Sequence, residues 1–289
     1  MVYPIVAGIP RFVFSQGYTE SFGLQWTRFS KTQLDSAQQT NRSLNRFVSE
    51  TQWKEAELSG KIVIDAGCGA GRFAEIVEKF NGHLIAVDYS SAVDVASSNL
   101  RSHKALFIQA DLTTLPFESG FADYVYCIGV LQHTSSPALI IEELLRILKA
   151  GGEMTLTFYE NSSWHVLLYS KYLIRPLTKR IPKRYLLAAI EKSSVIWFPL
   201  TNFLFSLPYP LNRMFRFVIP IANYVEYEYS NAGAAKDEAI LDTFDMLSPE
   251  YDKPIKRKHM HRWISNSNYE VVFLDRNNLK GTVRVRKVS

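Results

Sequence analysis

The sequence has little cysteine and no long apolar run, and each absence argues against a class of protein. Its 289 residues include two cysteines, Cys68 and Cys127, and no C-x-x-C pair. This cysteine usage fits a reducing cytoplasm and predicts neither a disulfide framework nor a metal site. No run of about 18 apolar residues occurs, so we expect no membrane-spanning helix. The apolar first residues lack a basic leader, which argues against a signal peptide.

Acidic residues are scarce in one segment of the chain. Between 161 and 225, nine basic residues accompany a single acid, Glu191, whereas the whole chain carries a net charge of +5. No acid occurs in 161–190, where six cations are interspersed with apolar residues. A basic amphipathic stretch fits an anionic acceptor or a negatively charged membrane surface, and equally a lid whose cations are simply solvated. Peripheral membrane contact through 161–190 is therefore one of three open interpretations.

A glycine-rich turn, Asp-Ala-Gly-Cys-Gly-Ala-Gly at 65–71, follows an apolar β-branched run. The pattern predicts a buried parallel strand that enters a tight turn, where the missing Cβ atoms let a ligand lie against the backbone. The helix that follows offers free N–H groups to an anion. A dinucleotide-binding turn has the spacing G-x-G-x-x-G, but Arg72 occupies the position of its third glycine.

Short apolar strands alternate with helical stretches through the middle of the chain. We expect strands at 61–66, 83–88, 105–109, 122–128 and 152–159, helices at 71–80, 91–101 and 137–149, and a final hairpin of strands near 270–275 and 281–287. Such alternation predicts an α/β fold with a doubly wound parallel sheet and right-handed crossovers. Between 161 and 230, repeated prolines predict that the chain is divided into short helices.

The glycine turn and the segments after it resemble the class I S-adenosylmethionine-dependent methyltransferases, in their small-molecule "type 11"-like branch. Four further blocks occur in the expected order: Ala-Val-Asp-Tyr-Ser at 86–90, Gln-Ala-Asp-Leu at 109–112, the strand and loop at 123–133, and Leu-Lys-Ala-Gly-Gly-Glu-Met-Thr-Leu-Thr at 148–157. The resemblance implies a seven-stranded, mostly parallel Rossmann-like sheet, N-terminal helices, a helical insertion after the fifth strand, and S-adenosyl-L-methionine as the cofactor.

The same resemblance implies roles for particular residues. Asp88 would bind the ribose hydroxyls and Asp111 the adenine amino group, whereas the structural alternative for either acid is to cap the next helix. His133 lies in the loop after the fourth strand and is the candidate general base, with a positioning role as the alternative. Independently of the resemblance, the polar cluster before the last helix suggests that Asp245 or Tyr251 orients His133 or the substrate. The residues expected to bind the cofactor are Asp65, Gly67, Cys68, Gly69, Gly71, Asp88, Tyr89, Asp111, Leu112 and Ile128, and no metal ligand is expected.

On this interpretation the chain has four segments. They are an N-terminal extension with cover helices (1–58), the cofactor-binding core (59–160), a helical insertion that acts as a substrate lid (161–235), and an active-site loop, helix and closing β-hairpin of the core (236–289). Residues 1–13 also resemble the end of a zinc-ribbon domain that precedes some methyltransferases. On the cover, Gln25, Trp26 and Arg28 are candidates for contact with the cofactor, with Arg28 pairing its carboxylate.

The resemblance implies methyl transfer to a small-molecule, glycan or lipid-linked acceptor, with oxygen as the expected acceptor atom, in a cytoplasmic enzyme. Two alternatives stay open. A nucleic-acid methyltransferase would use the basic insertion, but Cys-Ile-Gly-Val at 127–130 stands where base amino-methylation usually has a Pro-Pro-aromatic motif, and no Pro-Cys pair is present. A non-catalytic scaffold with the same fold would have no need of the glycine turn and both acids.

Overall fold

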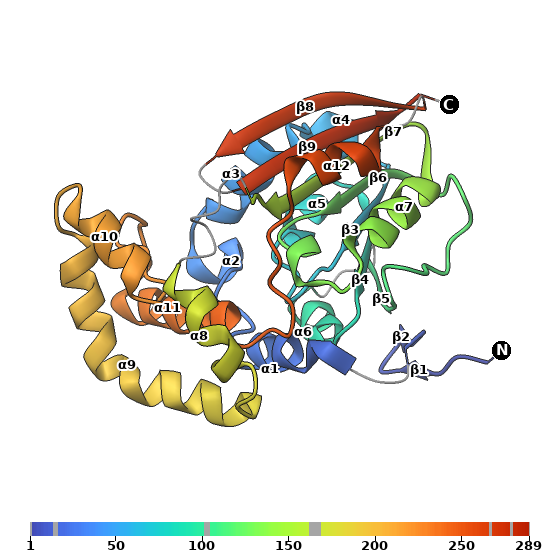
Figure 1. Cartoon of the computed structure of the whole chain (residues 1–289). Helices are drawn as coiled ribbons and strands as arrows, with labels where there is room; N and C mark the ends of the chain where they lie inside the picture. Colours follow the sequence, from blue (N-terminus) through green and yellow to red (C-terminus); the bar gives the residue numbers. More distant parts are fainter. Residues whose placement is uncertain are drawn as a thin grey trace.

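The computed structural model of the chain describes residues 2–13, 17–100, 105–161, 169–265, 268–277 and 280–288. A seven-stranded sheet lies at its centre, in the order β5-β4-β3-β6-β7-β9-β8 (Figure 1). Its strands are β3 (Ile62–Ala66), β4 (His83–Asp88), β5 (Ala105–Gln109), β6 (Ala122–Cys127), β7 (Leu148–Tyr159), β8 (Tyr269–Asn277) and β9 (Lys280–Lys287). The first five are parallel, and β9 is antiparallel to both of its neighbours. The predicted doubly wound, mostly parallel fold is confirmed.

Helices cover both faces of the central strands, which is why these strands consist of apolar residues rather than alternating apolar and polar ones. The helices of the core are α3 (Arg42–Thr51), α5 (Ala74–Lys79), α6 (Ala92–Asn99), α7 (Pro137–Ile147) and α12 (Arg257–Ile264). In β3, Ile64 packs in a cluster with residues of α7, whereas Val63 packs in a second cluster with residues of α3 and α5. Successive strand residues point to opposite faces, so one short strand contributes to both clusters.

The chain begins with a small hairpin that precedes the cover helices. It consists of β1 (Ile5–Val6) and β2 (Ile9–Pro10), followed by η1 (Gly17–Thr19), α1 (Glu20–Arg28), α2 (Asp35–Gln38), α3 and α4 (Glu55–Leu58). Arg11 attaches the hairpin to the sheet edge, because its guanidinium hydrogen-bonds Gln109 and pairs with Asp94. The resemblance of residues 1–13 to a zinc-ribbon tail stays a prediction.

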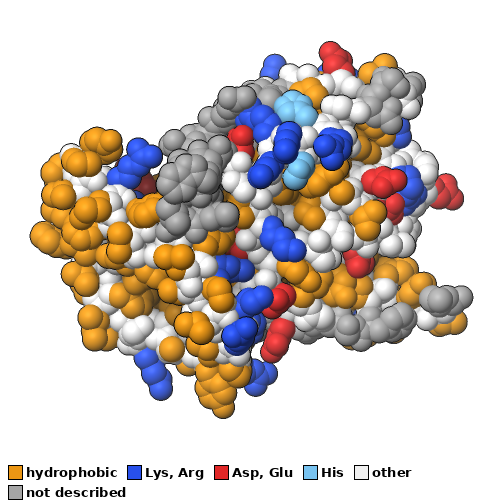
Figure 2. Space-filling model, in the orientation of Figure 1, with side chains coloured by type: hydrophobic (Ala, Val, Ile, Leu, Met, Phe, Trp, Pro, Cys, Tyr) orange, Lys and Arg blue, Asp and Glu red, His pale blue; other side chains and the backbone are white. Residues whose placement is uncertain are grey.

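Between β7 and the final hairpin the chain forms a helical layer beside the sheet (Figure 1). Its helices are α8 (Ser170–Thr178), α9 (Lys183–Phe205), α10 (Leu211–Val218) and α11 (Ala232–Leu247). Apolar side chains gather on the surface over α9 and α10, at the left of Figure 2. None of the helices in the described ranges is long and apolar enough to cross a membrane.

The prediction that prolines divide this layer into short helices is wrong for α9, which runs for 23 residues with Pro199 inside it. A proline in a helix removes one backbone hydrogen bond and strains the preceding turn. Here contacts on both sides of the proline offset that cost. Ile190 and Phe205 are buried, and the hydroxyl of Thr201 donates to the carbonyl oxygen of Trp197 at 2.8 Å.

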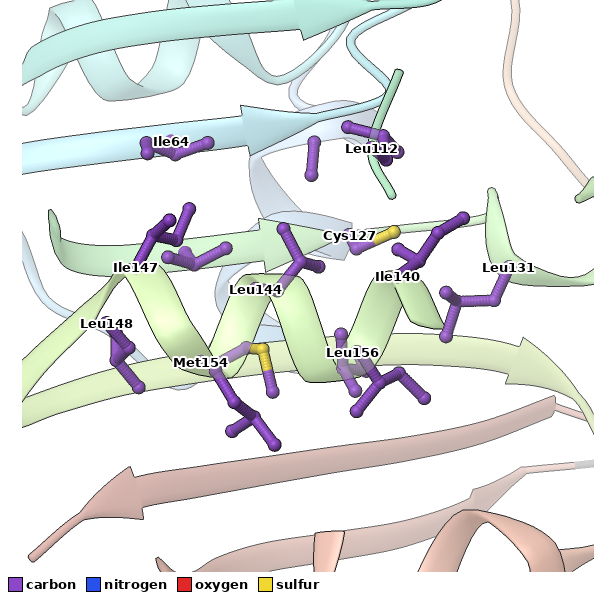
Figure 3. Close-up of a cluster of buried hydrophobic side chains, with 14 of the residues drawn as sticks. Ile64, Leu112, Cys127, Leu131, Ile140, Leu144, Ile147, Leu148, Met154 and Leu156 are labelled. Carbon is purple, nitrogen blue, oxygen red and sulfur yellow. The ribbon is translucent and has the colours of Figure 1, made fainter. Parts of the chain in front are cut away.

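One buried cluster connects the core to the loops at the carboxyl ends of the strands. Leu144 and Ile140 of α7 lie among Ile64, Cys127 and Leu156 of the sheet (Figure 3). Burying one such side chain contributes about 1.5–3 kcal/mol, and truncating it to alanine costs about 2–5 kcal/mol. The cluster extends to two residues of those loops, Leu112 and Leu131, so the core also fixes the segments that carry Asp111 and His133.

Candidate functional site

The loops after β3, β4 and β6 meet at one edge of the sheet. β3 lies between β4 and β6 in the sheet. From β3 the chain first adds β4 and β5 on one side, and then returns to add β6 and β7 on the other side. The backbone N–H groups of Gly67 and Cys68 both donate to the carbonyl oxygen of Val87, at 2.8 and 3.0 Å, so the turn after β3 rests on the end of β4. In an open α/β sheet, ligands bind at such a switch point, outside the carboxyl ends of the strands.

The three glycines of the turn all have positive φ angles: +89° at Gly67, +53° at Gly69 and +87° at Gly71. A Cβ atom on Gly67 would lie 2.5 Å from Cγ2 of Val130, and one on Gly69 would lie 3.0 Å from Nε1 of Trp26. Glycine is therefore required for backbone conformation and for space. The second contact places the indole of α1 directly against the turn, in agreement with its expected position on a cover.

Asp88 ends β4 and holds the glycine turn. Its Oδ2 accepts a hydrogen bond from the backbone N–H of Gly69 at 2.9 Å, and its Oδ1 accepts two from Ser90, from N–H at 2.8 Å and from Oγ at 2.7 Å. Burial raises the pKa of Asp88, and these three hydrogen bonds oppose the rise. Ser90 Oγ in turn accepts a hydrogen bond from the N–H of Ala92 at the start of α6. Ser90 rather than Asp88 therefore satisfies an N–H group of the helix, and the Asp88 carboxylate faces the glycine turn.

Asp111 lies in the loop after β5. Its Oδ1 accepts hydrogen bonds from the backbone N–H and the hydroxyl of Thr113, both at 2.8 Å. Its Oδ2 has no hydrogen-bond partner in the described part of the chain and is free to accept from a ligand. Burial, and then the charge of Asp111, raise the pKa of the Tyr18 phenol to about 12. The ring of Tyr18 stacks on Tyr89 at 5.6 Å and meets Tyr251 edge-on at 5.2 Å.

Asp65 is 2% exposed, and its Oδ2 has no hydrogen-bond partner among the described residues. Burial raises the pKa of Asp65 to about 8; the nearby Tyr126 hydroxyl opposes the rise and the charge of Asp88 adds to it. A buried carboxylate oxygen without a hydrogen-bond partner is costly, and we expect it to meet a donor or a cation when a ligand binds. The methionine end of S-adenosylmethionine carries an ammonium group and a sulfonium. Together with the glycine turn and the free Oδ2 of Asp111, the residues present fit this cofactor.

Arg28, which the sequence suggested as a partner of the cofactor carboxylate, forms an ion pair within the protein. Its Nε donates to Oε1 of Glu191 at 2.8 Å, so it joins α1 to α9. Sequence reasoning passed over Arg72, which directly follows the last glycine and donates to Ser43 Oγ at 3.0 Å. Burial and the nearby charge of Arg46 lower the pKa of Arg72 to about 10. Its position after G-x-G-x-G was the signal available in the sequence.

His133 ends the short helix η2 (Leu131–His133) after β6. Its Nδ1 lies 3.1 Å from the carbonyl oxygen of Tyr251. A carbonyl oxygen only accepts, so Nδ1 carries the proton and Nε2 presents a lone pair. Nε2 lies 3.9 Å from Oδ2 of Asp245. The ring is 6% exposed and packs edge-on against Phe22 and Tyr159.

Asp245 belongs to an acidic face of α11. Its Oδ1 accepts a hydrogen bond from Nε2 of Gln25 at 3.2 Å. Glu238, Asp242 and Asp245 follow one another at helical spacing, and Glu238 pairs with Arg42 through two bonds of 2.7 and 2.8 Å. Burial, then the charges of Glu238 and Asp245, raise the pKa of Asp242 to about 7. Of these three acids, only Asp245 was predicted from the sequence, although the helical spacing of Glu238 and Asp242 from it was visible there.

Three other predicted cofactor residues are apolar or nearly so and lie in the walls of the site. Cys68, Leu112 and Ile128 are 6%, 6% and 8% exposed, each within a buried cluster. Burial raises the pKa of the Cys68 thiol well above its ordinary value, which makes it an inert packing residue. Within the described ranges no group of three or more metal-binding side chains occurs.

Two neighbouring residues of α1 connect the halves of the site. Gln25 hydrogen-bonds Asp245 beside His133, and Trp26 lies against Gly69 of the glycine turn. Val130, which contacts the turn, also accepts the backbone N–H of His133 at 2.8 Å. The glycine turn and the ring of His133 therefore lie in one connected site, with Trp26 against the turn.

Comparisons with known proteins show similarity to methyltransferases. A family model described as a methyltransferase domain matches residues 64–156. The chain is 33% identical to tocopherol O-methyltransferase of Arabidopsis thaliana over 115 residues, 38% of this chain and 33% of the relative. It is 30% identical to ubiquinone biosynthesis O-methyltransferase of Nitrosomonas europaea over 132 residues, 42% and 55% of the two chains. The chain thus spans about half or less of the length of these curated relatives.

The fold is similar to a solved structure over most of its length. The PH0226 protein of Pyrococcus horikoshii OT3 matches 91% of this chain and 98% of its own, with a TM-score of 0.52 at 16% sequence identity. At this level of identity the similarity concerns the fold alone. It covers the helical layer as well as the sheet.

Proposed function

We propose that this chain, whose residues 64–156 form a class I S-adenosylmethionine-dependent methyltransferase domain, methylates an oxygen of a small-molecule, glycan or lipid-linked acceptor. The observation that carries the proposal is the geometry of His133, whose Nδ1 is bound to a carbonyl oxygen and whose Nε2 lies 3.9 Å from Asp245. The relatives are named as O-, N- and C-methyltransferases, so the choice of oxygen rests on the histidine. When bound, the cofactor supplies an electrophilic methyl group on its sulfonium.

In this proposal His133 is the general base. Its Nε2 accepts the proton of the acceptor hydroxyl as the oxygen attacks, and the ring becomes an imidazolium. The carboxylate of Asp245 stabilises that cation, and the carbonyl oxygen of Tyr251 keeps the tautomer and the ring orientation. Removing a general base typically costs about 10²–10⁴-fold in rate.

The remaining residues bind, orient and exclude water. Asp88 and Asp111 would accept hydrogen bonds from the two ends of the adenosine, and Asp65 would face the cationic methionine end. Phe22 and Tyr159 pack against the His133 ring and limit access of water to it. Exclusion of water matters because methyl transfer needs alignment of the oxygen with the methyl carbon and little other help.

The test compares His133→Gln with His83→Gln, since His83 is exposed at the opposite end of β4. Each protein is incubated with methyl-labelled S-adenosylmethionine and a panel of phenols, quinols, other alcohols and amines. We expect the first variant to keep cofactor affinity in calorimetry and to lose about 10²–10⁴-fold in kcat on the acceptor that the wild type methylates. Unchanged turnover by His133→Gln, or transfer of label to nitrogen acceptors alone, contradicts the proposal.

A further inference from the structure

The helix α9 is apolar on the face that it turns to solvent. Tyr185, Val195, Ile196, Leu200 and Phe203 are 50–72% exposed. Four of them, at 185, 196, 200 and 203, fall on one side of a helix with 3.6 residues per turn. A surface helix normally presents polar residues on this side.

The opposite face of the same helix is already used. Leu186, Leu187 and Ile190 are buried in a cluster with Ile240 and Phe244 of α11. The outward apolar residues are therefore not an alternative core face. They continue on α10, which packs on α9 and exposes a further apolar set on one face, Leu211, Met214 and Val218. Figure 2 shows this accumulation over α9 and α10, which we term the outer apolar face. Contiguous apolar surface of this kind marks an interaction site.

Unpaired cations flank the outer apolar face. Arg180, Arg184, Lys192 and Arg213 are exposed, and the structure gives their side chains no hydrogen bond or ion pair within the described ranges. The one acid between 170 and 218, Glu191, is neutralised by Arg28. Apolar residues beside uncompensated cations complement a surface that is both apolar and anionic. A second copy of the chain fits poorly, because a two-fold contact through this face would bring like charges together.

We propose that the outer apolar face docks into the headgroup region of an anionic lipid bilayer, with α9 lying in the membrane plane. A helix of 23 residues is about 35 Å long and can lie along the surface without crossing it. The structure shifts the contact predicted for 161–190 towards α9 and α10. Residues 162–168 lie outside the described residues, and Lys179 is paired with Glu250 at 2.9 Å.

The inner face of the docking helix α9 packs on α11, which carries Asp245. Helix α8, which precedes α9, is joined to the same segment. Arg175 of α8 is buried and donates to the carbonyl oxygens of Met246 and Pro249, at 2.7 and 2.8 Å. These residues lie between Asp245 and Tyr251, which contact the two nitrogens of His133. Docking would therefore hold the acceptor side of the site close to the lipid. That an acceptor reaches the site from the bilayer rests on the proposed function, whereas docking itself does not.

Co-sedimentation with lipid vesicles tests whether the exposed cations contribute to membrane binding. Phosphatidylcholine vesicles with and without phosphatidylglycerol are compared at low and high salt. Each cation near an anionic surface raises binding roughly fivefold, so Arg180→Gln, Arg184→Gln and Lys192→Gln together should lower it about a hundredfold. The matched control changes Lys256, Lys258 and Arg262, which are exposed beside or on α12, to glutamine. We expect this control, with the same loss of charge, to bind like the wild type.

A second variant set tests the apolar residues. Ile196→Ser, Leu200→Ser and Phe203→Ser together should abolish vesicle binding, whereas Val48→Ser, Leu106→Ser and Leu139→Ser, at exposed sites elsewhere, should not. In addition, a polarity-sensitive dye on Ile196→Cys should shift its emission to the blue when anionic vesicles are added.

Cofactor binding confirms in each case that the variant is folded. The proposal is overturned if the wild type does not bind anionic vesicles at low salt, or if the control variants lose as much vesicle binding as the test variants. It is also overturned if sedimentation equilibrium shows a dimer that the three serine substitutions on α9 dissociate. None of these measurements requires turnover, so failure here and failure of methyl transfer are separate results.

Discussion

The backbone N–H of Gly69 donates a hydrogen bond of 2.9 Å to Oδ2 of Asp88. The glycine turn has no long side chains of its own, so its shape depends on this carboxylate and on the carbonyl oxygen of Val87. The acid expected to bind ribose therefore also positions the backbone against which the cofactor lies. Replacing Asp88 by alanine would remove both functions at once and would not separate binding from local folding.

Asp88→Asn is the sharper change, because the amide keeps the shape of the side chain but loses the charge and one accepting oxygen. We expect a loss of about 1.5–3 kcal/mol, or tenfold to hundredfold, in S-adenosylmethionine affinity measured by calorimetry. Asp123→Asn is the control, since Asp123 accepts from the N–H of Ile62 at the amino end of β3. It should lower stability and leave affinity unchanged. Equal affinities in wild type and Asp88→Asn would show that the acid does not bind the cofactor.

The raised pKa of Asp65 leads us to expect that cofactor binding releases a proton. With a pKa of about 8, its carboxyl group is mostly protonated at neutral pH. A cationic ligand beside it favours the ionised form, so binding should release up to about one proton near pH 7. Calorimetry in buffers of different ionisation enthalpy measures this number directly. Asp65→Asn should remove the dependence on buffer, and a wild type without such dependence would mean that no cation approaches Asp65.

Asp242 makes stability depend on pH. Its pKa rises from 3.8 to about 7 on folding, so between these values the folded chain binds more protons than the unfolded chain. This contribution to stability is complete below about pH 4 and is lost as the pH rises towards 7. Asp242→Asn should therefore gain stability relative to wild type as the pH rises through this window, in denaturant unfolding. Asp237→Asn, exposed on the same helix, should show no such trend. A parallel pH dependence in all three proteins would contradict the assignment.

The sheet could be predicted because its signals are local. Each central strand is a short apolar run between turn residues, and β4 and β5 have the predicted bounds. The continuous α9 could not, since contacts with α11 outweigh the local effect of Pro199. The individual motifs of the site could be predicted from the sequence. Contacts between distant segments, such as that of Arg28 with Glu191, depend on how α1 packs against the helical layer. Residue spacing in the sequence contains no information on this packing.

The pairing of His133 with Asp245 is tested by a double-mutant cycle. Asp245→Asn retains an oxygen for the hydrogen bond from Gln25 but removes the charge 3.9 Å from Nε2 of His133. If Asp245 acts through the histidine, its loss should lower kcat on the order of tenfold to hundredfold, with the acceptor KM and cofactor affinity unchanged. In the background of His133→Gln the same substitution should have almost no further effect, because residues that act as a unit are not additive. Asp237→Asn is the charge-matched control and should keep full turnover. If Asp245→Asn costs as much in the His133→Gln background as in the wild type, Asp245 acts on the acceptor independently, and the histidine is not its partner.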